Sequence, residues 1–260
     1  MSSKIFRIAA VIVLAGSALS SAAGAATCSN ASLSGTYGFL HGTTDSNGTP
    51  TSAAVSQLTF DSTTGTFTGE NTGSHDGVIV TEPLTGTYTV ASNCTGTGYP
   101  TGGIPFSFVV TSTGFLAAHL FGDGIAVEQG SPTCTIAGVQ GSFGFEATGL
   151  FLAGAPATGA VVFMGELKLK VNPAGEGVIT GHVAVSEDGT FRTLAEDPVT
   201  GSYKVGGDCR GTATITTKSG SEMHFSLTVV DGGNEMLALE TDADTVVSGT
   251  LENNDLLQSF

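Results

Sequence analysis

The chain repeats itself in order, and this internal duplication constrains the fold more than any other feature. Two short motifs each occur twice: 33–39 (LSGTYGF) with 139–145 (VQGSFGF), and 84–90 (LTGTYTV) with 199–205 (VTGSYKV). Both copies of the second motif lead into a cysteine that is followed by x-Gly-Thr, at Cys94 and Cys209. The offset between matching residues rises steadily along the chain, as expected when insertions collect in loops while strands stay aligned. The sequence therefore predicts two copies of one folding unit.

Within each copy, apolar and polar residues alternate with a period of two. Tyr88 and Val90 fall on one face and Thr87 and Thr89 on the other, and the stretch 223–229 alternates in the same way. This is the pattern of an antiparallel sheet with one buried face. Turn motifs delimit about seven or eight strands per copy, and a meander of that size tends to close on itself. We expect an all-β protein of two tandem antiparallel meander barrels. Two β-sandwiches, or one barrel shared by both copies, remain open alternatives.

The first segment of the chain is predicted to be removed on export. Lys4 and Arg7 precede an apolar run from Ile8 to Leu19, and small residues follow. This order is typical of a secretory signal peptide, and the run is too short for a membrane span. The sequence predicts, in chain order, a signal peptide at 1–26, a first repeat at 27–132, a second repeat at 133–251 and a C-terminal tail at 252–260. We expect a secreted protein, extracellular or periplasmic, with no transmembrane helix after cleavage.

Four cysteines in an exported chain indicate two disulfides. Each copy has one cysteine before its first strand, Cys28 or Cys134, and one after its Gly-x-Tyr strand, Cys94 or Cys209. The symmetry of the repeat selects Cys28 with Cys94 and Cys134 with Cys209. A zinc site is disfavoured because no Cys-x-x-Cys spacing occurs, and we predict no metal.

The charge distribution restricts the partners. The formal net charge is −15, and removing Lys4 and Arg7 brings it to −17. No lysine or arginine lies between residues 27 and 133. Such a chain repels nucleic acid and anionic lipid, so we expect no nucleic-acid partner. No Gly-rich phosphate loop opens a helix, and no cofactor is predicted.

No cluster of catalytic residues is visible. The five histidines show no metal-ligand spacing, and no Gly-x-Ser-x-Gly elbow occurs. Glu70 and His182 occupy matching positions in the two copies. If their face points into a barrel, they are candidates for a general acid or base, as in an isomerase- or cyclase-like enzyme acting inside one barrel.

The sequence favours a non-enzymatic binding or interaction module over this enzyme. Its phenylalanines, including Phe39, Phe106, Phe108 and Phe145, suit either a filled core or an apolar small molecule held in a barrel. A surface partner is the other form of the hypothesis. The sequence indicates neither the ligand nor the oligomeric state.

The repeated unit resembles a group of exported bacterial proteins that carry one or two copies of two motifs. These are a Leu-x-Gly-x-Tyr-Gly-Phe opening, here 33–39, and a Gly-Thr-Tyr-x-Val-x-x-x-Cys-x-Gly centre, here 86–96, with a looser second copy. No activity is assigned to that group, so the resemblance implies no functional residue. More distantly, the strand count is similar to the small barrels of calycin and allene oxide cyclase type. That likeness is architectural and implies no function.

Overall fold

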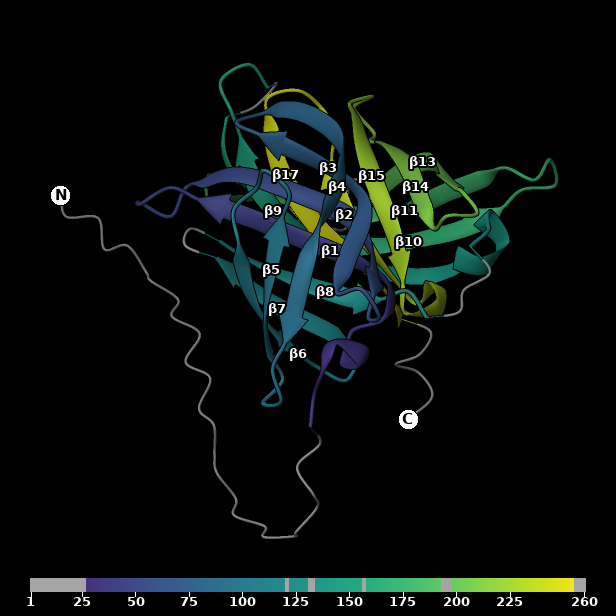
Figure 1. The fold of residues 1–260 in the computed structure, drawn as a ribbon. Helices are drawn as coiled ribbons and strands as arrows, with labels where there is room; N and C mark the ends of the chain where they lie inside the picture. Colours follow the sequence, from purple (N-terminus) through teal and green to yellow (C-terminus); the bar gives the residue numbers. More distant parts are fainter. Residues whose placement is uncertain (1–26, 120–121, 131–133, 156–157, 193–197, 255–260) are drawn as a thin grey trace, which may run out of the picture.

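The computed structural model describes residues 27–119, 122–130, 134–155, 158–192 and 198–254 (Figure 1). The predicted signal peptide 1–26 lies outside these residues, as does most of the predicted tail. Almost all regular structure is β-strand, in two barrels that lie side by side (Figure 1). Three short 3-10 helices complete it: η1 (Asn30–Ser32), η2 (Ile136–Val139) and η3 (Asp231–Gly233).

The first copy forms a closed barrel of eight antiparallel strands in meander order. The strands are β1 (Gly35–Thr44), β2 (Pro50–Asp61), β3 (Thr66–His75), β4 (Val78–Val90), β5 (Thr95–Pro100), β6 (Phe106–Val110), β7 (Gly114–His119) and β8 (Gly122–Glu128). Each strand pairs with the next, and β8 pairs back onto β1 from Tyr37 to Thr43, which closes the barrel.

The second copy closes in the same way. Its strands are β9 (Gly141–Phe151), β10 (Gly159–Val171), β11 (Gly177–Glu187), β12 (Thr190–Arg192), β13 (Pro198–Val205), β14 (Arg210–Thr216), β15 (Glu222–Val230), β16 (Glu235–Glu240) and β17 (Thr245–Asn253). β17 pairs with β9, β10 pairs with β11, and the short β12 pairs only with β11. The prediction of two meander barrels is confirmed, and the sandwich and shared-barrel alternatives are excluded because each copy closes on itself. β17 reaches Asn253, two residues into the predicted tail.

Both predicted disulfides are confirmed. Cys28 is bonded to Cys94 and Cys134 to Cys209, each with a Cα–Cα distance of 4.9 Å. Cys94 and Cys209 have matching left-handed backbone conformations, with φ of 68° and 66°. Each bond therefore joins the segment before the first strand of a barrel to the turn near its middle.

The tyrosine of the Gly-x-Tyr motif makes the same connection in each barrel. The Tyr88 hydroxyl donates a hydrogen bond to the Leu33 carbonyl at 2.7 Å, and the Tyr203 hydroxyl donates one to the Ile136 carbonyl at 3.1 Å. Burial raises the pKa of both phenols to about 12. The repeated motif thus anchors the 3-10 helix at the start of each copy to the barrel.

Removing one of these hydroxyls should destabilise its barrel. We expect Tyr88→Phe to lower the free energy of unfolding by about 1–2 kcal/mol, because the buried Leu33 carbonyl loses a hydrogen-bond donor. Urea denaturation measures this loss. Tyr99→Phe is the matched control, since Tyr99 is exposed on β5. Equal stabilities of the two variants would contradict this role for Tyr88.

A third apolar cluster joins the barrels through their outer faces. Ala53, Val55 and Val127 of the first barrel pack against four residues of the second: Val230, Leu237, Leu239 and Val246. Gly38 of β1 lies in this contact, because a Cβ there would collide with Val230 and Leu237. This close approach of the two barrels explains why a glycine precedes Phe39. The contact between the barrels also explains why β16 is apolar on both faces. Met236 and Ala238 face the core of the second barrel, and Leu237 and Leu239 face the interface with the first barrel.

Candidate binding surface between the barrels

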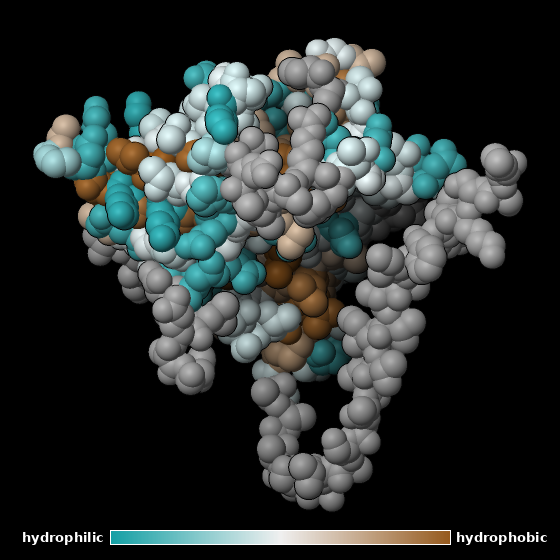
Figure 2. All heavy atoms as spheres, turned by 180° about the vertical axis from the view of Figure 1, so that it is seen from behind, coloured by the Kyte–Doolittle hydropathy of each residue, from teal (hydrophilic) through white to brown (hydrophobic). Residues whose placement is uncertain are grey.

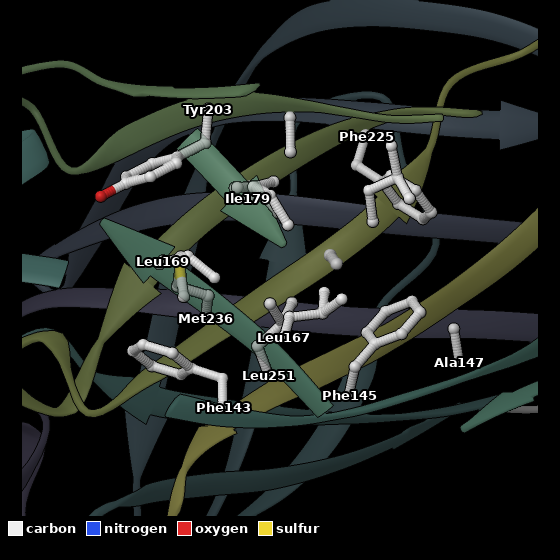
Figure 3. Close-up of a cluster of buried hydrophobic side chains, with 14 of the residues drawn as sticks. Phe143, Phe145, Ala147, Leu167, Leu169, Ile179, Tyr203, Phe225, Met236 and Leu251 are labelled. Carbon is white, nitrogen blue, oxygen red and sulfur yellow. The ribbon is translucent and has the colours of Figure 1, made fainter. Parts of the chain in front are cut away.

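The barrel interiors are filled with side chains. In the second barrel, apolar side chains from facing strands point toward one another (Figure 3). The cavity among them has a volume of about 10 Å³, which is room for one water molecule at most. Aromatic rings fill the first barrel and are all buried: Tyr37, Phe39, Phe60, Phe67, Tyr88, Phe106, Phe108 and Phe115. Phe39, Phe106, Phe108 and Phe145 therefore serve as core, and the cavity within the second barrel is too small for a ligand.

Glu70 lies on the outer face of the first barrel. It stands three residues from the inward-facing Phe67 on the regular strand β3, so its side chain points the other way. There its carboxylate forms an ion pair with Arg210 of the second barrel. Arg210 also pairs with Asp208 at 2.9 Å, and Gln57 donates a hydrogen bond to the Asp208 carbonyl. The structure thus places Glu70 in a contact between the barrels.

His182 is exposed on the outer face of β11. Its neighbour Val183 and the more distant Ile179 belong to the core of the second barrel, and His182 alternates with them. The structure does not bring His182 and Glu70 together, and it does not place either in a barrel interior. Their matching positions in the repeat correspond to matching outward positions on β3 and β11.

The carboxyl side chain of Glu240 points into the second barrel. Glu240 ends β16 on the same face as Met236 and Ala238 and is 2% exposed. Its Oε2 has no hydrogen-bond partner among the described residues. Burial, reinforced by the nearby charge of Asp242, raises the pKa of Glu240 to about 8. Asp242 itself accepts a hydrogen bond from the backbone N–H of His224 and pairs with its ring at 2.7 Å.

Sequence analysis missed Glu240 because β16 shows no polar face. The signal was nevertheless present: Glu240 shares the parity of Met236 and Ala238 in the stretch 235–240. The small cavity of the second barrel does not include Glu240 in its lining. The cavity in this barrel therefore offers no space for a substrate beside Glu240.

The outer surface between the barrels carries a groove that sequence analysis did not foresee. It consists of two adjoining hollows of about 540 and 670 Å³, which share Gly42, Asp123 and Ser248. Leu40, Leu116 and Ile125 line it from the first barrel, and Thr148, Val162 and Val246 from the second. We call this surface the apolar groove. Its volume is in the range of ordinary ligand and peptide sites.

The apolar side chains that line the groove from the first barrel lie in a row across three strands. Leu116, Ile125 and Leu40 are paired in succession on the outer face of β7, β8 and β1, and Val109 of β6 continues the row beyond the groove. Leu116 is 53% exposed and Ile125 is 40% exposed, whereas Leu40 packs against the interface between the barrels. Seen from behind, the surface shows apolar residues gathered in places among hydrophilic ones (Figure 2). The row therefore extends a buried interface onto the surface.

Val162 of β10, 37% exposed, lines the larger of the two hollows, and the exposed Met164 follows it on the same face of the strand. Exposed apolar side chains that gather along a groove are a common mark of a binding surface. The signal in the sequence was that Leu116 and Ile125 are apolar next to the inward-facing Phe115 and Ala126. Both faces of these strands are apolar, and periodicity alone does not tell which outer face stays uncovered.

A further hollow between the barrels, of about 590 Å³, is lined by charged as well as apolar side chains. Glu70, Lys204, Asp208 and Arg210 line it. Three of these four charged groups are already paired with one another. Its charges therefore serve the contact between the barrels.

Among the described residues, no group of three or more His, Cys, Asp or Glu side chains is arranged to hold a metal ion. No helix in the described part of the chain is long and apolar enough to cross a membrane. The chain matches no protein-family model, and comparison with curated proteins finds no relative.

Proposed function

We propose that this protein is an exported binding module that captures its partner in the apolar groove between its two barrels. The observation that carries the proposal is the exposure of Leu116, Ile125 and Val162 along one groove while both barrel interiors are packed. Burying such side chains against a partner is favourable by about 25 cal/mol per Å² of apolar surface. The surface-partner form of the binding hypothesis is thereby favoured over a ligand held inside a barrel.

Other features support an extracellular or periplasmic setting. The two disulfides fit an oxidising compartment, and residues 1–26 are predicted to be a signal peptide. The enzyme alternative has weaker support, because Glu70 is engaged with Arg210 and Glu240 has no cavity of useful size beside it. The likeness to calycin and allene oxide cyclase barrels stays a prediction.

A neutral apolar dye tests the groove directly. Nile red should bind saturably to the wild-type protein, with an increase in fluorescence. The double variant Leu116→Ser/Ile125→Ser should bind it about tenfold more weakly, because it removes two apolar contacts. Val78→Ser/Val80→Ser is the matched control, since both valines are exposed on β4 and neither lines the groove.

Both double variants should unfold within about 1 kcal/mol of wild type in urea, since exposed substitutions usually have small effects on stability. The proposal fails if Nile red does not bind saturably, or if the two double variants lose the same affinity.

A further inference from the structure

We infer that the partner in the apolar groove is an extended peptide segment whose apolar side chains are flanked by lysine or arginine. This inference rests on the proposed function and adds the chemistry of the partner. Three observations carry it: the charge of the lining, its hydroxyl groups and its exposed apolar side chains.

The charge of the groove is of one sign. Asp45 and Asp123 are the acidic residues that line it, and neither hollow has a lysine or arginine in its described lining. The first barrel contributes no cation anywhere, because residues 27–133 contain no lysine or arginine. Glu146 of β9 extends this acidic surface, because it lies two residues before Thr148 on the same exposed face of the strand. A cationic partner complements this surface, and an anionic one is repelled.

Hydroxyl groups also line the groove. Thr148 and Ser248 are directly paired on β9 and β17, and Thr44 of β1 lines the same hollow. Hydroxyls both donate and accept hydrogen bonds, so they suit the N–H and C=O groups of a peptide backbone. A peptide with alternating side chains can then place its apolar residues against Leu116, Ile125 and Val162.

A second copy of this chain fits the groove poorly. In a symmetric dimer the same surface meets itself, which would bring Asp123 of one copy toward the acidic lining of the other. Each mature copy carries a predicted charge of −17, so the two also repel one another at longer range.

Model peptides test the inference by isothermal titration calorimetry on the full mature chain. Leucine alternates with lysine in the first peptide, with serine in the second and with glutamate in the third, and a fourth alternates lysine with serine. The Lys/Leu peptide should bind most tightly and the Glu/Leu peptide should not bind. Raising the salt concentration should weaken the Lys/Leu complex, because exposed charges are screened.

Matched charge variants separate the groove from the general acidity of the protein. Asp123→Asn should weaken binding of the Lys/Leu peptide about two- to fivefold, as expected for loss of an exposed ion pair. Asp76→Asn, which removes the same charge from the exposed turn between β3 and β4, should leave the affinity unchanged. Leu116→Ser/Ile125→Ser should weaken it about tenfold.

The inference is overturned if the Ser/Leu peptide binds as tightly as the Lys/Leu peptide, or if Asp76→Asn weakens binding as much as Asp123→Asn. The proposed function survives either result provided that Nile red binding still depends on Leu116 and Ile125. Failure of both the peptides and Nile red would remove the proposed function as well. Concentration-dependent dimerisation that Leu116→Ser/Ile125→Ser abolishes would instead assign the groove to a second copy.

Discussion

Replacing Cys28 and Cys94 with serine is expected to lower the free energy of unfolding of the first barrel by about 4 kcal/mol. The bond closes a sequence separation of 66 residues, and the cross-link restricts the unfolded chain over that length. The Cys134→Ser/Cys209→Ser variant should lose a similar amount, since its bond spans a separation of 75 residues. Urea denaturation, followed separately for each variant, measures both losses.

If a cysteine variant does not fold, urea unfolding of the wild-type protein with and without a reductant gives the same comparison. Unfolding of the reduced protein should then begin at a lower urea concentration. Ser92→Ala is a matched control, because it changes an exposed serine close to the same bond. A loss below about 1 kcal/mol for either cysteine pair would contradict the account, since this is well below the effect expected of such a loop.

Replacing Glu240 with glutamine is expected to change how stability depends on pH. The folded pKa of about 8 lies above the ordinary value of 4.5, so the folded protein retains a proton that the unfolded chain releases between those values. The stabilising effect of this proton is fully present below about pH 4.5 and is lost as the pH rises through about 8. At pH 7, burial of Glu240 therefore lowers the free energy of unfolding by on the order of 3 kcal/mol relative to a side chain that does not titrate.

The difference in free energy of unfolding between Glu240→Gln and wild type should therefore shift in favour of the variant by that amount between pH 4.5 and pH 7. Burial also raises the pKa of Glu235, to about 7, with help from the charges of Glu252 and Asp231. Both proteins retain Glu235, so its effect cancels in the difference. Glu82→Gln, which makes the same substitution at an exposed position, is the matched control. A difference that stays flat across this range would refute the assignment of Glu240 as a buried neutral acid.

The architecture could be predicted because its signals are local or repeated. Strand alternation, the Gly-x-Tyr motif and the order of the cysteines are each present twice, and the duplicated pattern selected one disulfide pairing of three. The inward phenylalanines followed from the same alternation. Closure of each copy by its own first and last strands followed from the strand count.

The surface between the barrels could not be predicted, because it depends on how the copies pack. Alternation tells which residues share a face, but it does not tell whether that face meets water, the barrel interior or the other barrel. Glu70 shows this limit, because its partner Arg210 belongs to the other copy. Leu237 and Leu239 are covered by the first barrel, whereas Leu116 and Ile125 lie on an equally apolar face that stays exposed. Only the packing of the two barrels distinguishes these cases.

We propose that ligands bind this protein in the groove between the barrels and not inside them. Nuclear magnetic resonance of the methyl groups of Leu, Ile and Val, during titration with Nile red or the Lys/Leu peptide, tests it most directly. We predict that the methyl signals of Leu116, Ile125 and Val162 shift with the added ligand, while those of the interior Leu167, Leu169 and Ile179 stay in place. Shifts confined to the interior methyls, with the groove methyls unchanged, would contradict the claim.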